Sequence, residues 1–230
     1  MARKPSWISS LRLKKTRKAL CVSATSLSEF SLSVEKSMCE GLDQLLKQIR
    51  SCTECEAHLP CGPRPIVAAS ETASILIIGQ APGIRVHESG VPWDDPSGDR
   101  LREWMGVSKD DFYDESRIAL VPMGFCYPGT GESGDLPPRK ECAEIWHQPL
   151  LQQLSGMRLT LVIGQYAQKY RLGEHRKSSL TKTVQAWKEF TPANLPLPHP
   201  SPRNNRWLKK NPWFGDSVLP YLRRRVRRLL

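Results

Sequence analysis

The sequence has no long apolar run. No stretch of it approaches the roughly 18 consecutive apolar residues that a membrane-spanning helix needs, so we expect a soluble protein that does not enter a membrane. A secretory signal is missing as well, because no clean apolar core with a small-residue cleavage site stands near the first residue. These two absences predict a cytoplasmic protein, which we expect to be bacterial.

Acidic residues are few. The chain has 23 Asp and Glu against 34 Lys and Arg, with a formal net charge of +11 and a pI near 9.5. This balance predicts a polyanionic partner, because Lys and Arg that neutralise phosphates gain free energy from counterion release. Five arginines between positions 223 and 228 add a basic C-terminus, for which a solvated helix end is the alternative interpretation.

The first 38 residues differ from the rest of the chain. They carry eight basic side chains against two acidic ones, are rich in Ser, and show no sustained apolar periodicity. Residues 1–38 are therefore expected to form a basic disordered arm or a transit-like extension. Met38 stands immediately before a helical pattern, so an upstream extension from a misassigned start codon is equally open. Residues 39–230 fit one compact domain.

Apolar residues in this domain follow two different periods. Between positions 42 and 49 they recur at i, i+3, i+4 and i+7, which predicts one face of a helix, and short β-branched runs predict buried strands. Strands that alternate with helices predict an α/β fold, with a central parallel four-stranded sheet flanked by helices and the chemistry in loops at the carboxyl ends of the strands. The expected strands are 75–78, 118–121, 159–163 and 195–197, and further helices are expected from a cap at Ser97 through Met105 and over 138–154.

The number of cysteines, seven, is odd, and a disulfide framework is not expected in a chain without a secretory signal. Cys52 and Cys55 form a C-x2-C pair, whereas Cys126 and Cys142 lie far downstream with fifteen residues between them. Four thiolates suffice for one metal centre that joins an early loop to a later helix, and both an iron-sulfur cluster and a structural Zn²⁺ are open. The others are Cys61, which could replace one ligand, and Cys21 and Cys39, interpreted as free thiols.

Three loop motifs follow predicted strands or lie between them. GQAPG, residues 79–83, comes directly after the first strand, and its glycines and proline specify a rigid turn whose amides point into a cleft. GVPWDDPSG, residues 90–98, comes next along the chain. HPSPRNNRW, residues 199–207, follows the fourth predicted strand. Each motif is a modest signal, and the three in this order are much more specific.

In this order, the motifs and cysteines resemble the uracil-DNA glycosylase superfamily, most closely its iron-sulfur-containing family 4, over about residues 40–230. The resemblance implies an α/β fold, a monomer, and hydrolysis of the N-glycosidic bond of uracil or a related damaged base in DNA. It also decides between the two metal centres, since it implies a [4Fe-4S] cluster as cofactor. The cluster ligands that it implies are Cys52, Cys55, Cys126 and Cys142.

Base excision needs a flipped nucleotide, a stacking platform, a stabiliser of the departing base and a positioned water. Trp93 is the expected platform and His199 the donor to the base, whereas His87, Glu88 and Gln80 are the candidates for the water. A core tryptophan and a structural histidine are the alternatives. The catalytic set is His199, His87 and Gln80, and the substrate-binding set is Gly79, Gln80, Ala81, Pro82, Gly83, Trp93, His199, Ser201 and Arg203.

Three positions depart from the family pattern. Gln80 stands in place of the family's Glu, Ala81 where some members have Asp, and Pro122 in place of the Asn that reads uracil. Proline offers no side-chain hydrogen bond, so strict uracil specificity is not implied. The first hypothesis is a glycosylase for uracil or a related lesion. The alternatives are a catalytically weak DNA- or uracil-binding iron-sulfur protein of the same fold, and an iron-sulfur protein whose cleft takes another substrate.

Overall fold

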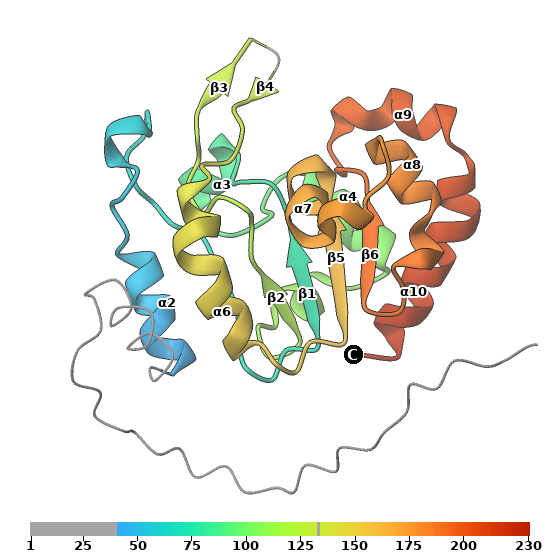
Figure 1. Ribbon diagram of the computed structural model, residues 1–230, viewed down its shortest axis with the longest axis horizontal. Coiled ribbons are helices and arrows are strands. Elements are labelled where there is room, and N and C mark those ends of the chain that lie inside the picture. Colours follow the sequence, from blue (N-terminus) through green and yellow to red (C-terminus); the bar gives the residue numbers. More distant parts are fainter. Residues whose placement is uncertain (1–40, 133) are drawn as a thin grey trace, which may run out of the picture.

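The computed structural model describes residues 41–132 and 134–230 (Figure 1). The extension expected over residues 1–38 lies outside the described residues and stays a prediction. No helix among the described residues is long and apolar enough to cross a membrane.

A four-stranded sheet forms the centre of the protein. Its strands are β1 (Ile75–Ile78), β2 (Ile118–Leu120), β5 (Leu159–Ile163) and β6 (Asn194–Leu197), in the order β2-β1-β5-β6. All three neighbouring pairs are parallel. The predicted central parallel sheet is confirmed, and each expected strand agrees with an observed one to within a residue at either end.

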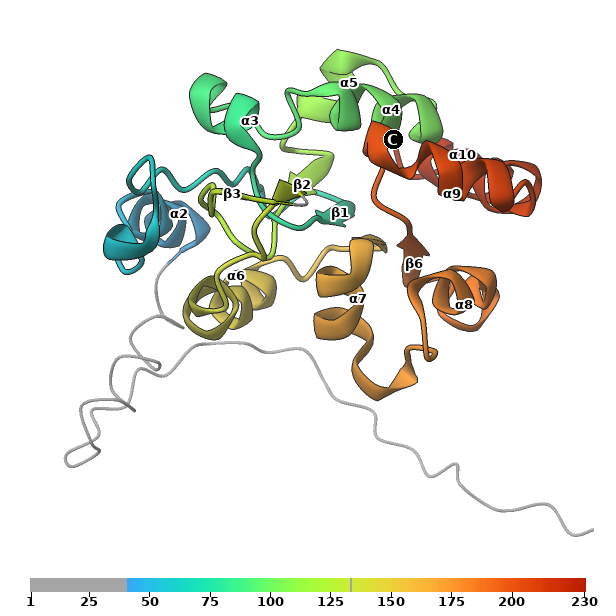
Figure 2. The same cartoon turned by 90° about the horizontal axis from the view of Figure 1, so that it is seen from above.

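Helices cover both faces of the sheet. Seen from above, α4, α5 and α10 lie on one side, and α2, α6 and α7 lie on the other (Figure 2). The helices are α2 (Leu42–Arg50), α3 (Ile84–Ser89), α4 (Pro96–Met105), α5 (Lys109–Tyr113), α6 (Gln148–Gln153), α7 (Gly164–Leu172), α8 (Leu180–Gln185), α9 (Asn205–Lys210) and α10 (Leu219–Arg227). Short 3-10 turns are Glu56–His58, Gly173–His175, Trp187–Glu189 and Pro202–Asn204, and π-helical segments are Ala143–His147 and Phe214–Val218.

The alternation of side chains along β1 explains the two layers. Ile75 and Ile77 belong to the core on the side of α4 and α10, whereas Leu76 and Ile78 belong to the core on the side of α2 and α6. Successive residues of a strand point to opposite faces, so a continuous apolar run is the pattern of a strand buried on both. All four residues are at most 2% exposed.

Two predicted helices differ in detail. The helix expected from a cap at Ser97 is capped by Asp95, whose Oδ1 accepts a hydrogen bond from the Gly98 amide at 2.8 Å. The helix expected over 138–154 is instead a π-helical segment followed by α6. Pro149 has no amide hydrogen to donate to the Ile145 carbonyl, so a regular α-helical ladder cannot run through this point.

A small hairpin occupies the Gly/Pro-rich segment 127–138. Its strands β3 (Thr130–Gly131) and β4 (Gly134–Asp135) are antiparallel, with Thr130 opposite Asp135. The Leu136 amide donates to the Gly129 carbonyl at 2.8 Å. The hairpin projects beyond the carboxyl ends of the sheet strands (Figure 1), which brings its residues to the edge where ligands bind in open parallel sheets.

Candidate active site

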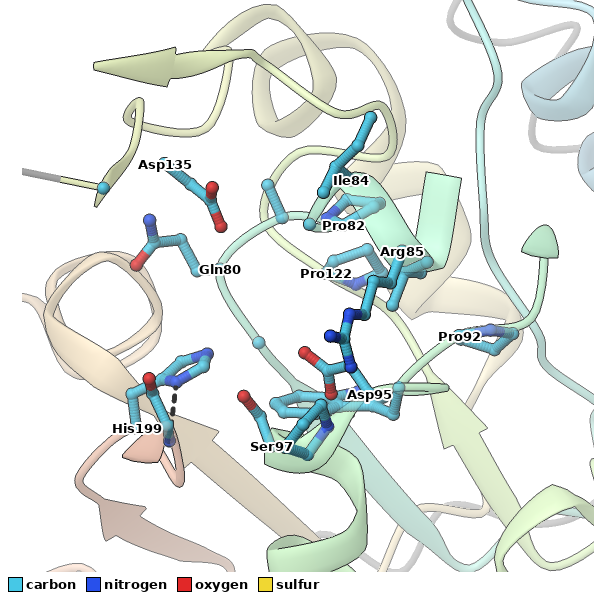
Figure 3. A pocket seen from close by; sticks show the side chains of 18 of the residues that line it. Gln80, Pro82, Ile84, Arg85, Pro92, Asp95, Ser97, Pro122, Asp135 and His199 are labelled. Carbon is cyan, nitrogen blue, oxygen red and sulfur yellow. Dashed lines mark hydrogen bonds between the residues drawn. The ribbon is translucent and has the colours of Figure 1, made fainter. Parts of the chain in front are cut away.

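A cavity of about 550 Å³ lies at the carboxyl ends of the strands. Gln80 follows β1 by two residues, Pro122 follows β2 by two, and His199 follows β6 by two. In the view of Figure 3, Gln80 lies between Asp135 and His199 on one side, with Asp95 and Arg85 across from them. The lining includes all five residues of the first loop motif, and also Pro92, Trp93, Asp95, Pro96 and Ser97 from the second, and His199, Ser201, Pro202, Arg203 and Asn204 from the third.

The imidazole of His199 is fixed in one protonation form. Its Nδ1 accepts a hydrogen bond from the Ser201 amide at 3.2 Å, so the neutral ring carries its proton on Nε2. Burial lowers the pKa of His199 below its ordinary value, and the carboxylates of Asp95 and Asp135 oppose part of this shift. His199 is therefore a neutral hydrogen-bond donor near pH 7.

The indole of Trp93 stacks on the His199 imidazole. The ring centroids are 5.7 Å apart, and the planes differ by 26°. Gly79 permits this arrangement, because a Cβ atom there would lie 2.7 Å from Cζ2 of Trp93. The expected stacking platform therefore lines the cavity, with the expected base donor as its neighbour.

The backbone of Trp93 has a positive φ of 59°, which residues other than glycine rarely adopt. Two contacts hold its carbonyl. Arg102 donates to this oxygen at 3.4 Å, and Gly98 lies so close that a Cβ atom there would be 1.8 Å from it. The start of α4 thus has no room for a side chain at position 98.

We expect Gly98→Ala to destabilise the protein by about 1–3 kcal/mol or more, because the new methyl group must displace the Trp93 carbonyl. Chemical denaturation measures the change in the free energy of unfolding. Gly215→Ala is the matched control, since a Cβ atom there meets nothing within 4 Å. Equal stability of Gly98→Ala and wild type would contradict the close approach.

The first loop is fastened to the segment that follows β2. The Met123 amide donates to the Gly79 carbonyl, and the Gly124 amide donates to the Gln80 carbonyl, each at 3.0 Å. The backbone of Gln80 is therefore held while its side chain lies at the cavity (Figure 3). The rigid turn expected from the glycines and proline of this motif agrees with these contacts.

The last loop folds back on itself beside His199. The Asn204 side chain donates to the His199 carbonyl at 2.8 Å, and Arg100 donates to the Ser201 carbonyl at 3.2 Å. The Ser201 hydroxyl accepts from the Arg203 amide at 3.2 Å. Ser201 and Arg203, both in the expected substrate-binding set, line the cavity.

Two of the three candidates for the water, His87 and Glu88, are not brought to the cavity by the structure. The lining includes Arg85 and Val86 from α3, but not His87 or Glu88. The His87 ring instead faces Tyr127, with centroids 6.0 Å apart, and its buried Nδ1 has no hydrogen-bond partner among the described residues. Successive residues of a helix point about 100° apart, and this turn directs His87 away from the cavity.

Sequence reasoning missed Asp135 and Asp95, both of which line the cavity. The segment that carries Asp135 is rich in glycine and proline and also contains two acidic residues, Glu132 and Asp135. The sequence feature that could have identified Asp135 is its position, as an acidic residue between two predicted metal ligands, Cys126 and Cys142.

The four predicted cluster ligands, Cys52, Cys55, Cys126 and Cys142, line a second, small cavity. All four are free thiols, whereas Cys61 is exposed and does not belong to the lining. No three His, Cys, Asp or Glu side chains in residues 41–132 and 134–230 could hold a single metal ion as they stand. The structure therefore places the four thiols around one cavity without converging them on one point.

Burial dominates the electrostatics of this cysteine cavity. Burial, with a smaller contribution from the other thiols of the group, raises the pKa of Cys126 to about 11 and that of Cys142 to about 12. The Phe125 amide donates to Cys142 Sγ at 3.4 Å. Arg139 also lines the cavity, and it opposes part of the rise that burial causes in the pKa of Cys55.

A central parallel sheet with three loop motifs around one cleft at its carboxyl edge defines an α/β protein with an active-site-like cavity. The sequence pattern of the uracil DNA glycosylase superfamily matches residues 67–223. The chain belongs to this superfamily, which confirms the resemblance of the motifs. The matched range includes Cys126 and Cys142, while Cys52 and Cys55 precede it.

Two relatives add to this comparison. A Type-4 uracil-DNA glycosylase from Archaeoglobus fulgidus is 24% identical over 136 residues, which cover 57% of this chain and 63% of that protein. The chain thus matches less than two thirds of that relative's length. A solution NMR structure of a candidate uracil DNA glycosylase from Methanosarcina acetivorans is 19% identical, covers 69% of this chain and 97% of that chain, and has a TM-score of 0.42.

Proposed function

We propose that the protein is a DNA glycosylase that hydrolyses the N-glycosidic bond of uracil or a related damaged base, as in base excision repair. The observation that carries the proposal is His199: a neutral imidazole with its Nε2 proton free for a ligand, in a cavity at the carboxyl edge of the sheet. Membership of the superfamily and the type-4 relative support it.

His199 would stabilise the departing base. When the glycosidic bond breaks, its electron pair leaves with the base, and negative charge develops on a carbonyl oxygen. A neutral donor at this oxygen gains strength as the charge grows, so it favours the transition state over the ground state. Trp93, stacked on the imidazole, holds its plane and offers an aromatic surface beside a flipped base.

The protein would recognise the base differently from a glycosylase that is strictly specific for uracil. Pro122 lines the cavity where the family pattern has Asn, and its carbonyl is already paired with His147 Nε2 at 3.0 Å. A pocket without a side-chain amide at this position loses a bidentate contact that discriminates between bases. We therefore propose a substrate range that includes uracil-related lesions.

We propose that the protein holds a [4Fe-4S] cluster through the thiols that line the cysteine cavity, Cys52, Cys55, Cys126 and Cys142. Its donor set is four thiols, which is the ligand set of a cluster in which each thiolate binds a different iron. When bound, the cluster supplies a cross-link between the loop after α2 and the segments on either side of the hairpin. Arg139 would place a positive charge beside the ligand Cys55.

The partner would be DNA that contains a damaged base. Arg85 and Arg203 line the cavity, and α9 adds Arg206, Lys209 and Lys210 directly after the last loop motif. These cations would neutralise phosphates on either side of a flipped nucleotide. We propose that a single domain over residues 39–230 does this as a monomer in the bacterial cytoplasm, and that the basic extension 1–38 adds nonspecific affinity.

A second candidate is a protein of the same fold that binds DNA or uracil and catalyses weakly. Pro122 and Gln80, which replace two polar residues of the family pattern, favour it. Excision assays on purified protein separate the two. Duplexes and single strands with uracil, hypoxanthine, xanthine or oxidised pyrimidines are incubated with the protein and then cleaved with alkali.

The glycosylase proposal predicts release of at least one of these bases under single-turnover conditions. Unmodified DNA of the same sequence is the control for nonspecific cleavage. If wild-type protein with a full complement of iron releases none of them while still binding the DNA, the binding protein becomes the correct interpretation.

A further inference from the structure

A carboxylate lies at the cavity beside the first loop and is not accounted for by the roles above. Asp135, at the end of β4, lines the cavity together with Gln80 and His199 (Figure 3). Its Oδ2 is 3.5 Å from the position that a Cβ atom on Gly83 would take. Its charge also reaches His199, because it is one of the two carboxylates that oppose the lowering of that pKa.

Asp135 differs from Asp95 and Gln80, which line the same cavity, in that its side chain can both accept a hydrogen bond from water and take up a proton. The Asp95 carboxylate accepts the Gly98 amide and so caps α4. Gln80 presents an amide, which cannot take up a proton at neutral pH. The Asp135 carboxylate makes no hydrogen bond or ion pair with any residue of the described ranges 41–132 and 134–230, and so remains available for a water molecule.

Contacts of the hairpin hold the backbone on either side of Asp135. Gly134 packs against the Arg203 guanidinium so closely that a Cβ atom there would overlap it. The Leu136 amide on the other side of Asp135 is bonded to the Gly129 carbonyl. The backbone at Asp135 thus lies between the last loop motif and the base of the hairpin, and its exposed side chain lines the same cavity as the proposed base donor.

We propose that Asp135 positions and deprotonates the water that attacks the sugar, an inference that rests on the proposed glycosylase function. The bond between C1′ and the base nitrogen breaks, and its electron pair leaves with the base toward His199. The water oxygen then bonds to C1′ while one of its protons passes to the Asp135 carboxylate. That proton is returned to the base anion, so the products are the free base and an abasic deoxyribose with a hydroxyl at C1′.

If Asp135 is the general base, the first loop does not need an acidic residue for this purpose. Positions 80 and 81 are Gln and Ala, and neither can act as a general base. The Asp135 carboxylate, which comes from the hairpin, lines the same cavity next to Gly83. Oriented general bases contribute about 10²- to 10⁴-fold to a rate, which is enough to separate an active enzyme from a weak one.

The test uses Asp135→Asn and the full-length protein on its best substrate in single-turnover assays. We expect base release to slow by about 10²-fold or more, whereas the affinity for DNA with an uncleavable analogue stays equal or increases, because a negative charge near phosphates is lost. Glu132→Gln is the matched control: it removes a charge from the same hairpin, is exposed, and does not line the cavity. It should retain the wild-type rate.

A second variant separates a chemical role from a structural one. Asp135→Ala leaves space for a small carboxylate, so added formate should restore part of its lost rate. If Asp135→Asn is as fast as Glu132→Gln, or if formate leaves Asp135→Ala unchanged, Asp135 does not handle the water. Wild-type protein that releases no base would overturn the proposed function itself, which is a different outcome from an active wild type with an active Asp135→Asn.

Discussion

We expect His199→Ala to slow the proposed base release by about 10²-fold or more in single-turnover assays and to change DNA affinity little. The imidazole presents its Nε2 proton to the cavity, because Nδ1 is occupied by the Ser201 amide. Its contact with the base becomes strong only as negative charge develops on the departing base. Loss of this contact therefore raises the barrier by about 3 kcal/mol while binding of the ground state is nearly unaffected.

The matched control for this variant is His175→Ala. His175 is exposed in a short 3-10 turn and is absent from the lining of the cavity. It should keep the wild-type rate. Quench-flow or manual sampling with excess enzyme gives the rate constant, and fluorescence anisotropy with an uncleavable analogue gives the affinity. A His199→Ala protein that is as fast as wild type would show that the histidine is structural, with Trp93 as its packing partner.

We expect Cys142→Ala to have the second large effect, the loss of the proposed iron-sulfur cluster and of most soluble protein. Wild-type protein prepared without oxygen is expected to be brown and to contain about four iron atoms per chain. Cys142 is buried in the core beneath α6 as well as in the cysteine cavity. Its removal would release the cross-link between the early loop and the later segment, and the folding energy that metal binding supplies.

Cys61→Ala is the control, because Cys61 is exposed and stands outside the cysteine cavity. This variant should retain both iron and solubility. Iron and zinc are measured by elemental analysis, and the cluster by its visible absorption. Stoichiometric zinc without iron in the wild type would overturn the cluster, and equal iron content in Cys142→Ala would remove Cys142 from its ligands.

The fold was largely predictable because its signals are local. The run from Ile75 to Ile78 is apolar at every position, and such a run between turns specifies a strand buried on both faces. The period of 3.6 in α2 specified a helix with one buried side. The π-helical segment before α6 was not predictable in this way, since the apolar spacing from Cys142 to Leu150 fits an ordinary helix. The cap of α4 was misassigned by two residues, because Ser97 and Asp95 are both good capping residues.

The parts of the site that the sequence motifs encode were predictable. Glycines and prolines at 79, 82 and 83 encode the turn itself, so the loop and its place after β1 follow from the sequence. The partners of that loop do not follow, because Met123 and Asp135 reach it from other segments. His87 shows the reverse error: it is close to the motif in sequence, and the turn of α3 directs it elsewhere.

The sequence alone determined the sheet, the three motif loops, membership of a superfamily and four thiols with the composition of a cluster site. Only the tertiary structure decided that His199 is a neutral donor stacked on Trp93, that the four thiols share one cavity, and that Asp135 stands at the substrate cavity. The physical reason is the distance along the chain over which each interaction acts. Backbone preference and apolar periodicity act over a few residues, whereas tautomer, pKa and orientation depend on atoms that folding brings together from distant parts of the chain.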